Sequence, residues 1–517
     1  MAATQSELGM AIEGQPQDAQ AVASRDRSVP SGRISHRLDQ IIAGGLAVSV
    51  VFTALAHGAV EPWSRALFEL TIIALVFAWG LKAVLDQRLP LRVPLAVLPL
   101  AGLAVIGFIQ CLAVTGSDGV RRSLSMDVEG TRQTETMILI LLCAFMIAAN
   151  FFSTHKRTGL LAKFLIGFGF LLSVFGIVQS LAWNGKFYWL RTNSTGLSPF
   201  GPFVNHNNFA GCIEMLAPIP VGLIITRFAR TEARLFYGFA AAIMAVAILA
   251  SLSRGGIISL GAEAVFLAVL GPLVRRGETG HEESDEHSHT SSHSQGGFSI
   301  NHRHVSFAKA SLVALLLVAA ITTAAIWMAS DKVGGGAAAT EPGRSTEETF
   351  YTSRGWIWRD TVAMIEARPI LGFGLGAFAT AYPIYSRSDG TIAVDRAHND
   401  YLQIVADCGV LGAGLVIWFV FLMARAIFRG ITSRDRMLAG FALGGGAGVF
   451  ALAVHSIFDF NLQVPSNALL FLVITAQTSL IGAGLVEERR RRIIKHRSHD
   501  SIESAGNDGA ILQELPQ

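Results

Sequence analysis

The sequence is poor in charged residues and in cysteine. Charged side chains make up only 15% of the chain and nearly cancel, which leaves a formal net charge of +3. So small a charge gives no case for nucleic-acid binding, which requires a concentrated positive field. The four cysteines show neither CxxC spacing nor a metal-ligand pattern. We interpret most of them as small apolar packing residues; Cys212 and Cys408, expected at outer span ends, leave a disulfide open.

Apolar residues, in contrast, dominate the chain. They account for 51% of the residues, and the mean hydropathy is +0.47. Apolar runs of roughly the 20 residues needed to cross a bilayer recur from end to end. The sequence therefore predicts an all-α polytopic membrane protein with about twelve transmembrane helices. The predicted spans are 41–57, 66–85, 93–114, 136–152, 160–183, 211–226, 235–252, 256–274, 309–329, 409–429, 437–455 and 464–486.

Lys and Arg residues in the short loops orient the predicted spans. Cationic loops close to span ends are retained on the cytoplasmic side of a membrane, and a single assignment satisfies the loops of this chain. It places both termini in the cytoplasm. No apolar stretch typical of a cleaved signal peptide precedes residue 41. The basic residues behind this assignment include Arg33, Arg37, Lys82, Arg88, Arg157, Arg230, Arg276, Arg429 and Arg490.

The same assignment divides the chain into tails, spans and one large outer loop. We expect a disordered cytoplasmic tail at 1–40, spans one to nine within 41–329, an outer loop at 330–408, spans ten to twelve within 409–486, and a second cytoplasmic tail at 487–517. Only the outer loop is long enough to form a subdomain on that side of the membrane.

A histidine-rich cytoplasmic loop at 277–304 raises an alternative function. Its six histidines lie among Ser, Gly and acidic residues. Such a loop either binds zinc, as loops of metal transporters do, or is a disordered solvated linker, the interpretation that we favour. A metal transporter also needs ligands within the bilayer, and His455 with Asp459, one helical turn apart, is the best candidate pair. A polytopic transporter, metal-linked through this loop, is therefore the alternative hypothesis.

Three cationic or titratable groups fall on the outer side. Arg254 follows one apolar span, and Gly255 and Gly256 open the next. An Arg at a span end either snorkels to lipid headgroups or binds an anion with the help of helix-end N–H groups. Arg354 begins an amphipathic, tryptophan-containing stretch, where a guanidinium can bind phosphate bidentately. His398 precedes the helical pattern that leads into the tenth span.

A glycine-rich segment at 372–378 resembles a dinucleotide-binding fingerprint only superficially. The pattern G-x-G-x-x-A is complete, but no strand precedes it and no βαβ unit fits between membrane spans. We interpret the glycines as flexible turns that reposition the outer loop.

Taken together, these motifs carry a family resemblance. From about residue 201 to 482 the chain resembles the bacterial O-antigen ligase and Wzy-type polysaccharide polymerase superfamily. The motifs that carry it are Gly201-Pro202-Phe203-Val204-Asn205-His206-Asn207-Asn208 running into Glu214, Ser253-Arg254-Gly255-Gly256, Ser353-Arg354 with Trp358, the glycine turn at 372–376, His398-Asn399-Asp400-Tyr401-Leu402, and Asp459 with Pro465.

The resemblance implies a fold, a reaction and a place in the cell. The fold is a C-type glycosyltransferase-like helical bundle with a large periplasmic loop over the site. The reaction moves a glycan from a lipid-linked donor, of the undecaprenyl diphosphate kind, to an acceptor hydroxyl, and needs no metal and no other cofactor. The place is the bacterial inner membrane, with the active site facing the periplasm. Chain-length or export proteins for polysaccharide are candidate partners.

The chemistry of such a transfer assigns roles to the three outer groups. Negative charge builds on the diphosphate as it leaves, and Arg254 and Arg354 are the candidates that stabilise it. The acceptor hydroxyl must lose a proton, and His398 is the candidate general base, since imidazole titrates near pH ~6.5. Asn399 or Asp400 is expected to orient the imidazole. The predicted substrate-binding residues are Asn205, Asn207, Glu214, Asn399, Asp400 and Asp459.

The acceptor stays open at this point. Ligation to lipid A-core, polymerisation of a lipid-linked repeat in exopolysaccharide or O-antigen synthesis, and transfer to protein all use the same donor chemistry. The tract His57-Gly58-Ala59-Val60-Glu61-Pro62-Trp63-Ser64 resembles a feature of exopolysaccharide-type members and favours a polymerase.

Overall fold

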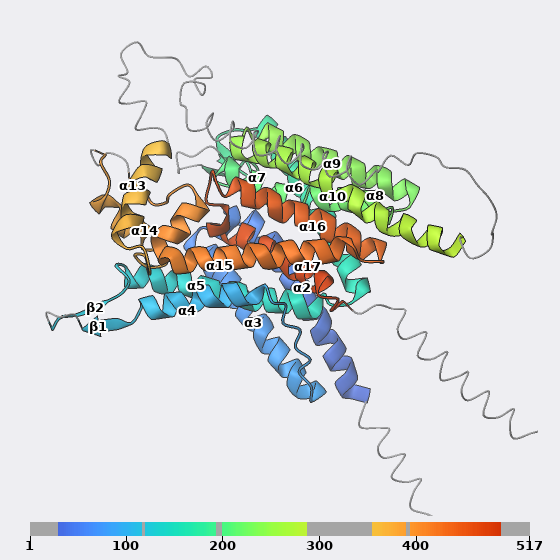
Figure 1. Cartoon of the computed structure of the whole chain (residues 1–517), viewed down its shortest axis with the longest axis horizontal. Coiled ribbons are helices and arrows are strands. Elements are labelled where there is room, and N and C mark those ends of the chain that lie inside the picture. Colours follow the sequence, from blue (N-terminus) through green and yellow to red (C-terminus); the bar gives the residue numbers. More distant parts are fainter. Residues whose placement is uncertain (1–28, 116–118, 193–198, 287–353, 389–392, 487–517) are drawn as a thin grey trace, which may run out of the picture.

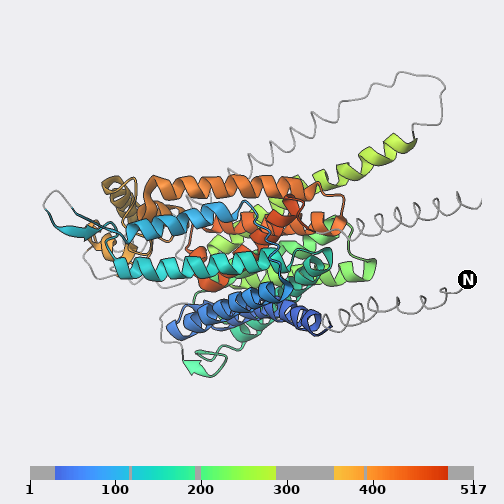
Figure 2. The same cartoon turned by 90° about the horizontal axis from the view of Figure 1, so that it is seen from below.

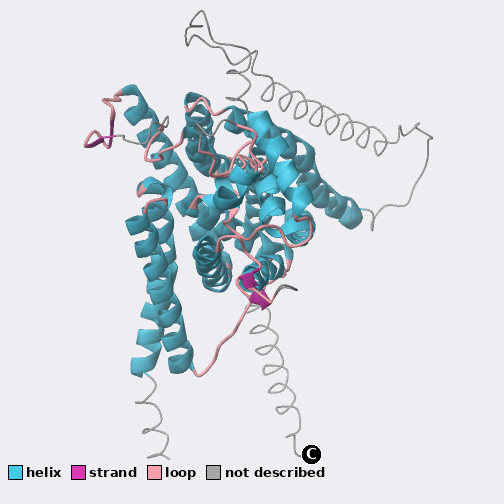
Figure 3. Cartoon of the chain, turned by 90° about the vertical axis from the view of Figure 1, so that its left-hand side faces the viewer, coloured by secondary structure: helices cyan, strands magenta, loops and turns pink. Residues whose placement is uncertain are grey.

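The computed structural model describes residues 29–115, 119–192, 199–286, 354–388 and 393–486, and these are almost entirely helical (Figure 1). Strands are confined to two short antiparallel hairpins, β1–β2 and β3–β4 (Figure 3). The elements are α2 (Val29–Leu55), η1 (His57–Ala59), α3 (Pro62–Asp86), α4 (Val97–Gln110), β1 (Ala113–Thr115), β2 (Arg121–Ser123), α5 (Val128–Phe151), α6 (His155–Leu181), β3 (Lys186–Phe187), β4 (Arg191–Thr192), α7 (His206–Glu214), α8 (Pro218–Ile225), α9 (Thr231–Ala250), α10 (Arg254–Glu286), α13 (Arg354–Ala367), α14 (Phe378–Ala381), η2 (Tyr382–Ile384), α15 (Asp400–Ile431), α16 (Arg436–His455), η3 (Asn461–Gln463) and α17 (Pro465–Gly482).

The predicted class, an all-α polytopic membrane protein, is confirmed. Among the described residues, ten helical stretches are long and apolar enough to cross a membrane. The third predicted span corresponds to the shorter apolar helix α4, and the sixth is made by α7 and α8 in succession. The ninth predicted span, 309–329, lies outside the described residues. Helix α2 begins at Val29, ahead of the apolar run that starts at residue 41.

Helices α16 and α17 form the centre of the bundle. Their spans are 89% and 94% buried, against 17% for α3 at the edge. Glycines make this burial possible: a Cβ atom on Gly444 would lie 2.5 Å from the Pro218 carbonyl oxygen of α8, and one on Gly448 would lie 2.5 Å from that of Met215. Because lipid offers no hydrophobic drive for helices to associate, such close backbone approach is what holds membrane helices together.

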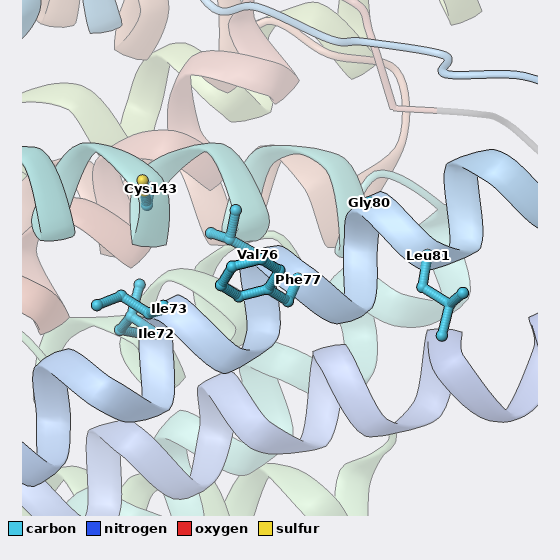
Figure 4. Close-up of a pocket in the computed structure, with 7 residues that line it drawn as sticks. All are labelled: Ile72, Ile73, Val76, Phe77, Gly80, Leu81 and Cys143. Atoms are coloured by element: carbon cyan, nitrogen blue, oxygen red, sulfur yellow. The ribbon is translucent and has the colours of Figure 1, made fainter.

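Helix α3, by contrast, keeps an open apolar face. Side chains of α3, together with Cys143 of α5, line a groove of about 390 Å³ (Figure 4). Phe77 at this face is 74% exposed, as suits a surface in contact with lipid chains. Cys143 and the other three cysteines are all free thiols. The structure therefore forms no Cys212–Cys408 disulfide.

A subdomain covers one end of the bundle, and we call it the outer subdomain after the side predicted from the sequence. Helices α13 and α14 gather there with the β1–β2 hairpin (Figure 1), around a core of Trp356, Met364, Phe373, Phe378 and Tyr382. Helix α15 starts in this subdomain and continues beside α4 into the bundle (Figure 2). It kinks at Gly409, where φ is 62° and ψ is −157°.

The glycine turn at 372–376 joins the outer subdomain to the bundle. Gln110 at the end of α4 donates to the carbonyls of Leu371 (2.7 Å) and Asp407 (2.8 Å) and accepts from the N–H of Leu375 (2.9 Å). Gly372, Gly374 and Gly376 have φ of 66°, 119° and 76°. A Cβ atom on Gly372 would clash with the backbone of Asp407. The predicted turn is present, and its glycines serve close packing and positive φ.

We predict that Gly409→Ala lowers the stability of the protein. The kink lies in a region of φ/ψ space that only glycine adopts readily, and a Cβ atom would clash with the carbonyl of Ile370. Strain of this kind costs about 1–3 kcal/mol, which thermal unfolding in detergent would detect as a lower Tm. The matched control is Gly414→Ala in the same helix, where a Cβ atom meets nothing within 4 Å. Equal Tm values for the two variants would contradict the prediction.

Candidate active site

The residues of interest converge on the short connection between α16 and α17, residues 458–463, which we call the α16–α17 loop. It begins where the His455 carbonyl, at the end of α16, accepts from the N–H groups of Phe458 (2.8 Å) and Asp459 (3.1 Å). It ends with the 3₁₀ turn η3 and with Pro465 at the first turn of α17, where a missing N–H costs nothing. The loop is thus anchored by the two most buried helices.

Asp459 in this loop accepts from two of the three predicted catalytic residues. Its Oδ1 lies 3.4 Å from His398 Nδ1, and its Oδ2 lies 3.4 Å from Arg354 Nη2. Arg354 also donates to the carbonyl of Phe458. The Asp459 side chain is only 1% exposed, whereas those of Arg354 and His398 are 31% and 29% exposed. A buried carboxylate therefore binds a guanidinium and an imidazole that both reach the surface.

The electrostatics of this group favour an ionised Asp459. Burial alone would raise its pKa, but the hydrogen bond from His398 and the nearby Arg354 charge outweigh burial and hold the pKa below its usual range. Since a carboxylate only accepts, Nδ1 of His398 carries the proton in this contact. The other ring nitrogen, Nε2, is then left as an acceptor.

The backbone presents His398 in a fixed orientation. Its φ is +50°, which is uncommon for a residue other than glycine. The carbonyl of the preceding Ala397 accepts from Trp358 Nε1 (3.0 Å), and the Ala397 N–H donates to Gln403 Oε1 (2.8 Å). The imidazole packs edge-on against Phe460, with 5.0 Å between ring centroids. Strained conformations of this kind persist only where the surroundings enforce them.

Asn399 and Asp400 hold this segment in place but do not contact the imidazole. Asn399 caps α15 by accepting from the N–H groups of Tyr401 and Leu402, both at 3.0 Å. Asp400 accepts from Ser456 Oγ (3.0 Å) and, in the α16–α17 loop, from the N–H of Leu462 (3.2 Å) and Gln463 Nε2 (3.1 Å). The residue that orients His398 is Asp459, so the expectation of Asn399 or Asp400 is wrong.

Glu214 lies in the interior of the bundle. Its side chain is 0% exposed, and its Oε2 lies 2.9 Å from Nδ1 of His455, itself 1% exposed. His455 therefore pairs with Glu214, and Asp459 pairs with His398 and Arg354, so the two do not form the zinc pair considered from the sequence. Among the described residues, no group of three or more His, Cys, Asp or Glu side chains is arranged to hold a metal ion.

The remaining predicted residues lie at the starts of α10 and α7. Arg254 is the first residue of α10, and the Gly255 next to it packs against the imidazole of His455. Asn205 caps α7 by accepting from the N–H of Asn207 (2.9 Å), and both side chains are half-buried. Just before them, the Pro202 carbonyl accepts from His57 Nδ1 (2.8 Å). The tract at 57–64 thus adjoins the Asn205 motif.

Sequence reasoning missed the residues that organise the loop. Phe460 packs against His398, and the guanidinium of Arg396 lies 5.0 Å from the Phe460 ring. Gln463 binds both Asp400 and Arg396. The available signal was the polar sequence Asp459-Phe460-Asn461-Leu462-Gln463 between two long apolar spans, where irregular backbone needs fixed partners.

Residues 239–418 match the family model described as O-Antigen ligase (Wzy_C). This range includes Arg254, Arg354 and His398 and ends before the α16–α17 loop. A search of curated proteins found no match.

We predict that Asp459→Asn destabilises the protein in a pH-dependent way. A depressed folded-state pKa contributes stability that is present above the unfolded value of about 3.9 and is lost as pH falls through the folded value. At pH 7 the free energy of unfolding of the variant should therefore be lower by about 2 kcal/mol, which is the contribution of a hydrogen bond to a charged group. The difference should shrink in strong acid. The measurement is Tm in detergent against pH.

The control for this experiment is Asp395→Asn. The Asp395 side chain is 74% exposed and lies 3.7 Å from Arg396, and exposed pairs contribute little. Its Tm should equal that of the unchanged protein at every pH. Asp459→Asn and Asp395→Asn having the same Tm at neutral pH would sink the assignment of Asp459 as the central carboxylate.

Proposed function

Residues 239–418 identify the protein as a member of the O-antigen ligase and Wzy superfamily, membrane glycosyltransferase-like enzymes that act on lipid-linked glycans, and from this premise we propose a specific reaction. The protein transfers a glycan from a polyprenyl diphosphate to an acceptor hydroxyl at the periplasmic face of the bacterial inner membrane. The observation that carries this proposal is the shared contact of His398 and Arg354 with the buried Asp459.

The geometry supports His398 as the general base. Asp459 engages Nδ1 and leaves Nε2 to accept the proton of the acceptor hydroxyl. As the proton moves to Nε2, the hydroxyl oxygen forms a bond to the anomeric carbon of the donor. The bond from that carbon to the diphosphate oxygen breaks, and the polyprenyl diphosphate leaves with the electron pair. Asp459 stabilises the imidazolium formed in this step.

Two guanidinium groups suit the departing diphosphate. Arg354 uses part of its donor set on Phe458 and Asp459 and is 31% exposed; a guanidinium has five N–H donors in all. Arg254 begins a long helix, α10, where backbone N–H groups and the helix dipole favour an anion. We propose that these two charges do the work that other diphosphate-transferring enzymes give to a metal ion, so that no metal is required.

The charges at the two ends of the helices support a site on the periplasmic side. His398, Arg354 and Asp459 lie at one end of the bundle, near the start of α15 and the end of α16. At the start of α16, Asp435 pairs with His155, and Asp39 pairs with Lys82 and Arg157 of the loops expected in the cytoplasm. The positive-inside rule then favours cytoplasmic termini and a site that faces the periplasm.

We propose that the acceptor is another lipid-linked glycan, as in a polymerase of exopolysaccharide or O-antigen. The tract at 57–64 supports this choice, because His57 binds Pro202 and so fixes the tract against the Asn205 motif. A lipid A-core acceptor remains the other outcome of the same chemistry, and the experiment below separates the two.

We predict that His398→Ala, Arg254→Ala and Arg354→Ala each abolish one long-chain glycan when they replace the wild-type gene. Loss of the base should reduce the rate by about 10²–10⁴, and loss of one charge-stabilising donor by about 10²–10³. The measurement is gel analysis of lipopolysaccharide and exopolysaccharide at matched membrane levels. Loss of free polymer, or lipid A-core that carries a single repeat in place of long chains, identifies a polymerase, and lipid A-core without any repeat identifies a ligase.

The matched control is Arg387→Ala. This residue lies in the same outer subdomain with its side chain 67% exposed, and exposed charges of this kind contribute little. It should support normal glycan levels. If the three site variants also support normal levels, the site assignment is wrong, and a transporter or a scaffold explains the protein better.

We also predict that deletion of the histidine-rich loop, 277–304, leaves glycan assembly intact. Backbone is described only to Glu286 in α10, so 287–304 lies outside the described residues. The loop is far in sequence from His398 and is not expected to touch the substrate. Loss of metal uptake or efflux on deletion, with glycan assembly unchanged in the site variants, would favour the transporter instead.

A further inference from the structure

We propose that His455 and Glu214 form a buried positioning pair that sets the places of both Arg254 and Asp459 for glycan transfer. The inference rests on the proposed function, because it assigns these two residues a task in that reaction. Neither residue is expected to touch the substrate, since both side chains are buried. They act through the groups that do.

The first observation is the pair itself. His455 Nδ1 lies 2.9 Å and 3.1 Å from the two carboxylate oxygens of Glu214, and the side chains are 1% and 0% exposed. This contact joins α16 to α7, two helices whose paired residues are 241 positions apart in the sequence. Replacing a buried ionic pair with apolar residues of equal volume is often neutral or stabilising. Stability alone is therefore a weak reason for the pair, and positioning of neighbouring site residues is a better one.

The second observation links the pair to Arg254. A Cβ atom on Gly255 would lie 2.5 Å from both Nε2 and Cδ2 of His455. The imidazole therefore packs directly on the first turn of α10, next to the residue that carries the guanidinium. Glu214 holds the ring from the Nδ1 side, so the ring cannot turn away from Gly255 without breaking that contact. The position of the imidazole thus sets the position of the first turn of α10, and with it that of Arg254.

The third observation links the pair to Asp459. The carbonyl of His455 accepts from the N–H groups of Phe458 and Asp459, so the same residue anchors the α16–α17 loop. Glu214 reaches the loop by a second route, because Gly211, one turn earlier in α7, packs tightly against Asn461. The pair is therefore the junction of α7, α10 and the loop that carries Asp459.

As a consequence, the positions of Arg254 and Asp459 are coupled. Arg254 stabilises the leaving group and Asp459 orients the base, and both are placed by one buried contact. A displacement of about 1 Å in such groups can cost about 10²-fold in rate. Loosening the pair should therefore reduce kcat and leave KM nearly unchanged, because the binding groups for the glycan remain.

The experiment compares Glu214→Gln and Gly255→Ala in the full-length protein in proteoliposomes. The substrate is a lipid-linked glycan of the native repeat, and formation of product is timed under saturating donor. Each variant should lower kcat by about 10–100-fold, Gly255→Ala by pushing the imidazole from its place. The matched control is Gly261→Ala in the same helix, where a Cβ atom meets nothing within 4 Å. It should behave as wild type.

A double-mutant cycle separates positioning from general loss of structure. Glu214→Gln and Gly255→Ala are each combined with Arg254→Lys, which retains a charge but not the guanidinium geometry. If the pair acts in part through Arg254, adding Glu214→Gln or Gly255→Ala to Arg254→Lys should lower kcat by a smaller factor than the same change does in the wild-type protein. Full multiplication of the two losses would overturn the proposal, as would wild-type kcat in both Glu214→Gln and Gly255→Ala.

His455→Asn provides the conservative rescue. Its amide places a donor where Nδ1 lies, so it keeps a bond to Glu214 and should retain more activity than His455→Ala; equal activity of the two would count against the pair. If Glu214→Gln does not accumulate in membranes, the comparison of Gly255→Ala with Gly261→Ala decides the matter. Failure of the proposed function is recognised separately, because the wild-type protein would then form no product from the lipid-linked glycan.

Discussion

A buried carboxylate that must be neutralised is the constraint on which the site depends. Asp459 is 1% exposed at the end of the two most buried helices, and an unpaired charge there would be costly. Arg354 and His398 supply the compensation from a different part of the chain. The interaction that satisfies Asp459 is therefore the same one that brings a guanidinium and an imidazole together at the surface of the bundle.

The α16–α17 loop acts as a template for the outer subdomain. Residues 458–463 contact Arg354, His398, Asp400 and Arg396 in turn. A second attachment, from Gln110 of α4 to the glycine turn and Asp407, fixes the opposite side of that subdomain. Functional groups supported on rigid elements in this way keep their geometry, which matters when one of them, His398, has a strained backbone.

The packing of the bundle explains how polar groups persist in it. Helix α16 carries glycines that come within backbone contact of its neighbours, Gly444 at the start of α8 and Gly448 at Met215 between α7 and α8. This close packing replaces the hydrophobic drive that lipid does not supply. The C-terminal end of α16 then places the His455 imidazole between the Glu214 carboxylate and Gly255 at the start of α10. Close packing and polar pairing are thus parts of one arrangement.

The sequence by itself determined the membrane class and most of the spans, because apolar runs and the polar residues that interrupt them are local features. It also pointed to His398, Arg254 and Arg354. Only the tertiary structure decided which acid serves His398, since Asp459 lies 61 positions away and Asn399 and Asp400 instead cap and anchor a helix. It likewise turned Glu214 toward His455, across 241 positions. Burial and pairing of this kind depend on which helices meet, and no local pattern specifies that.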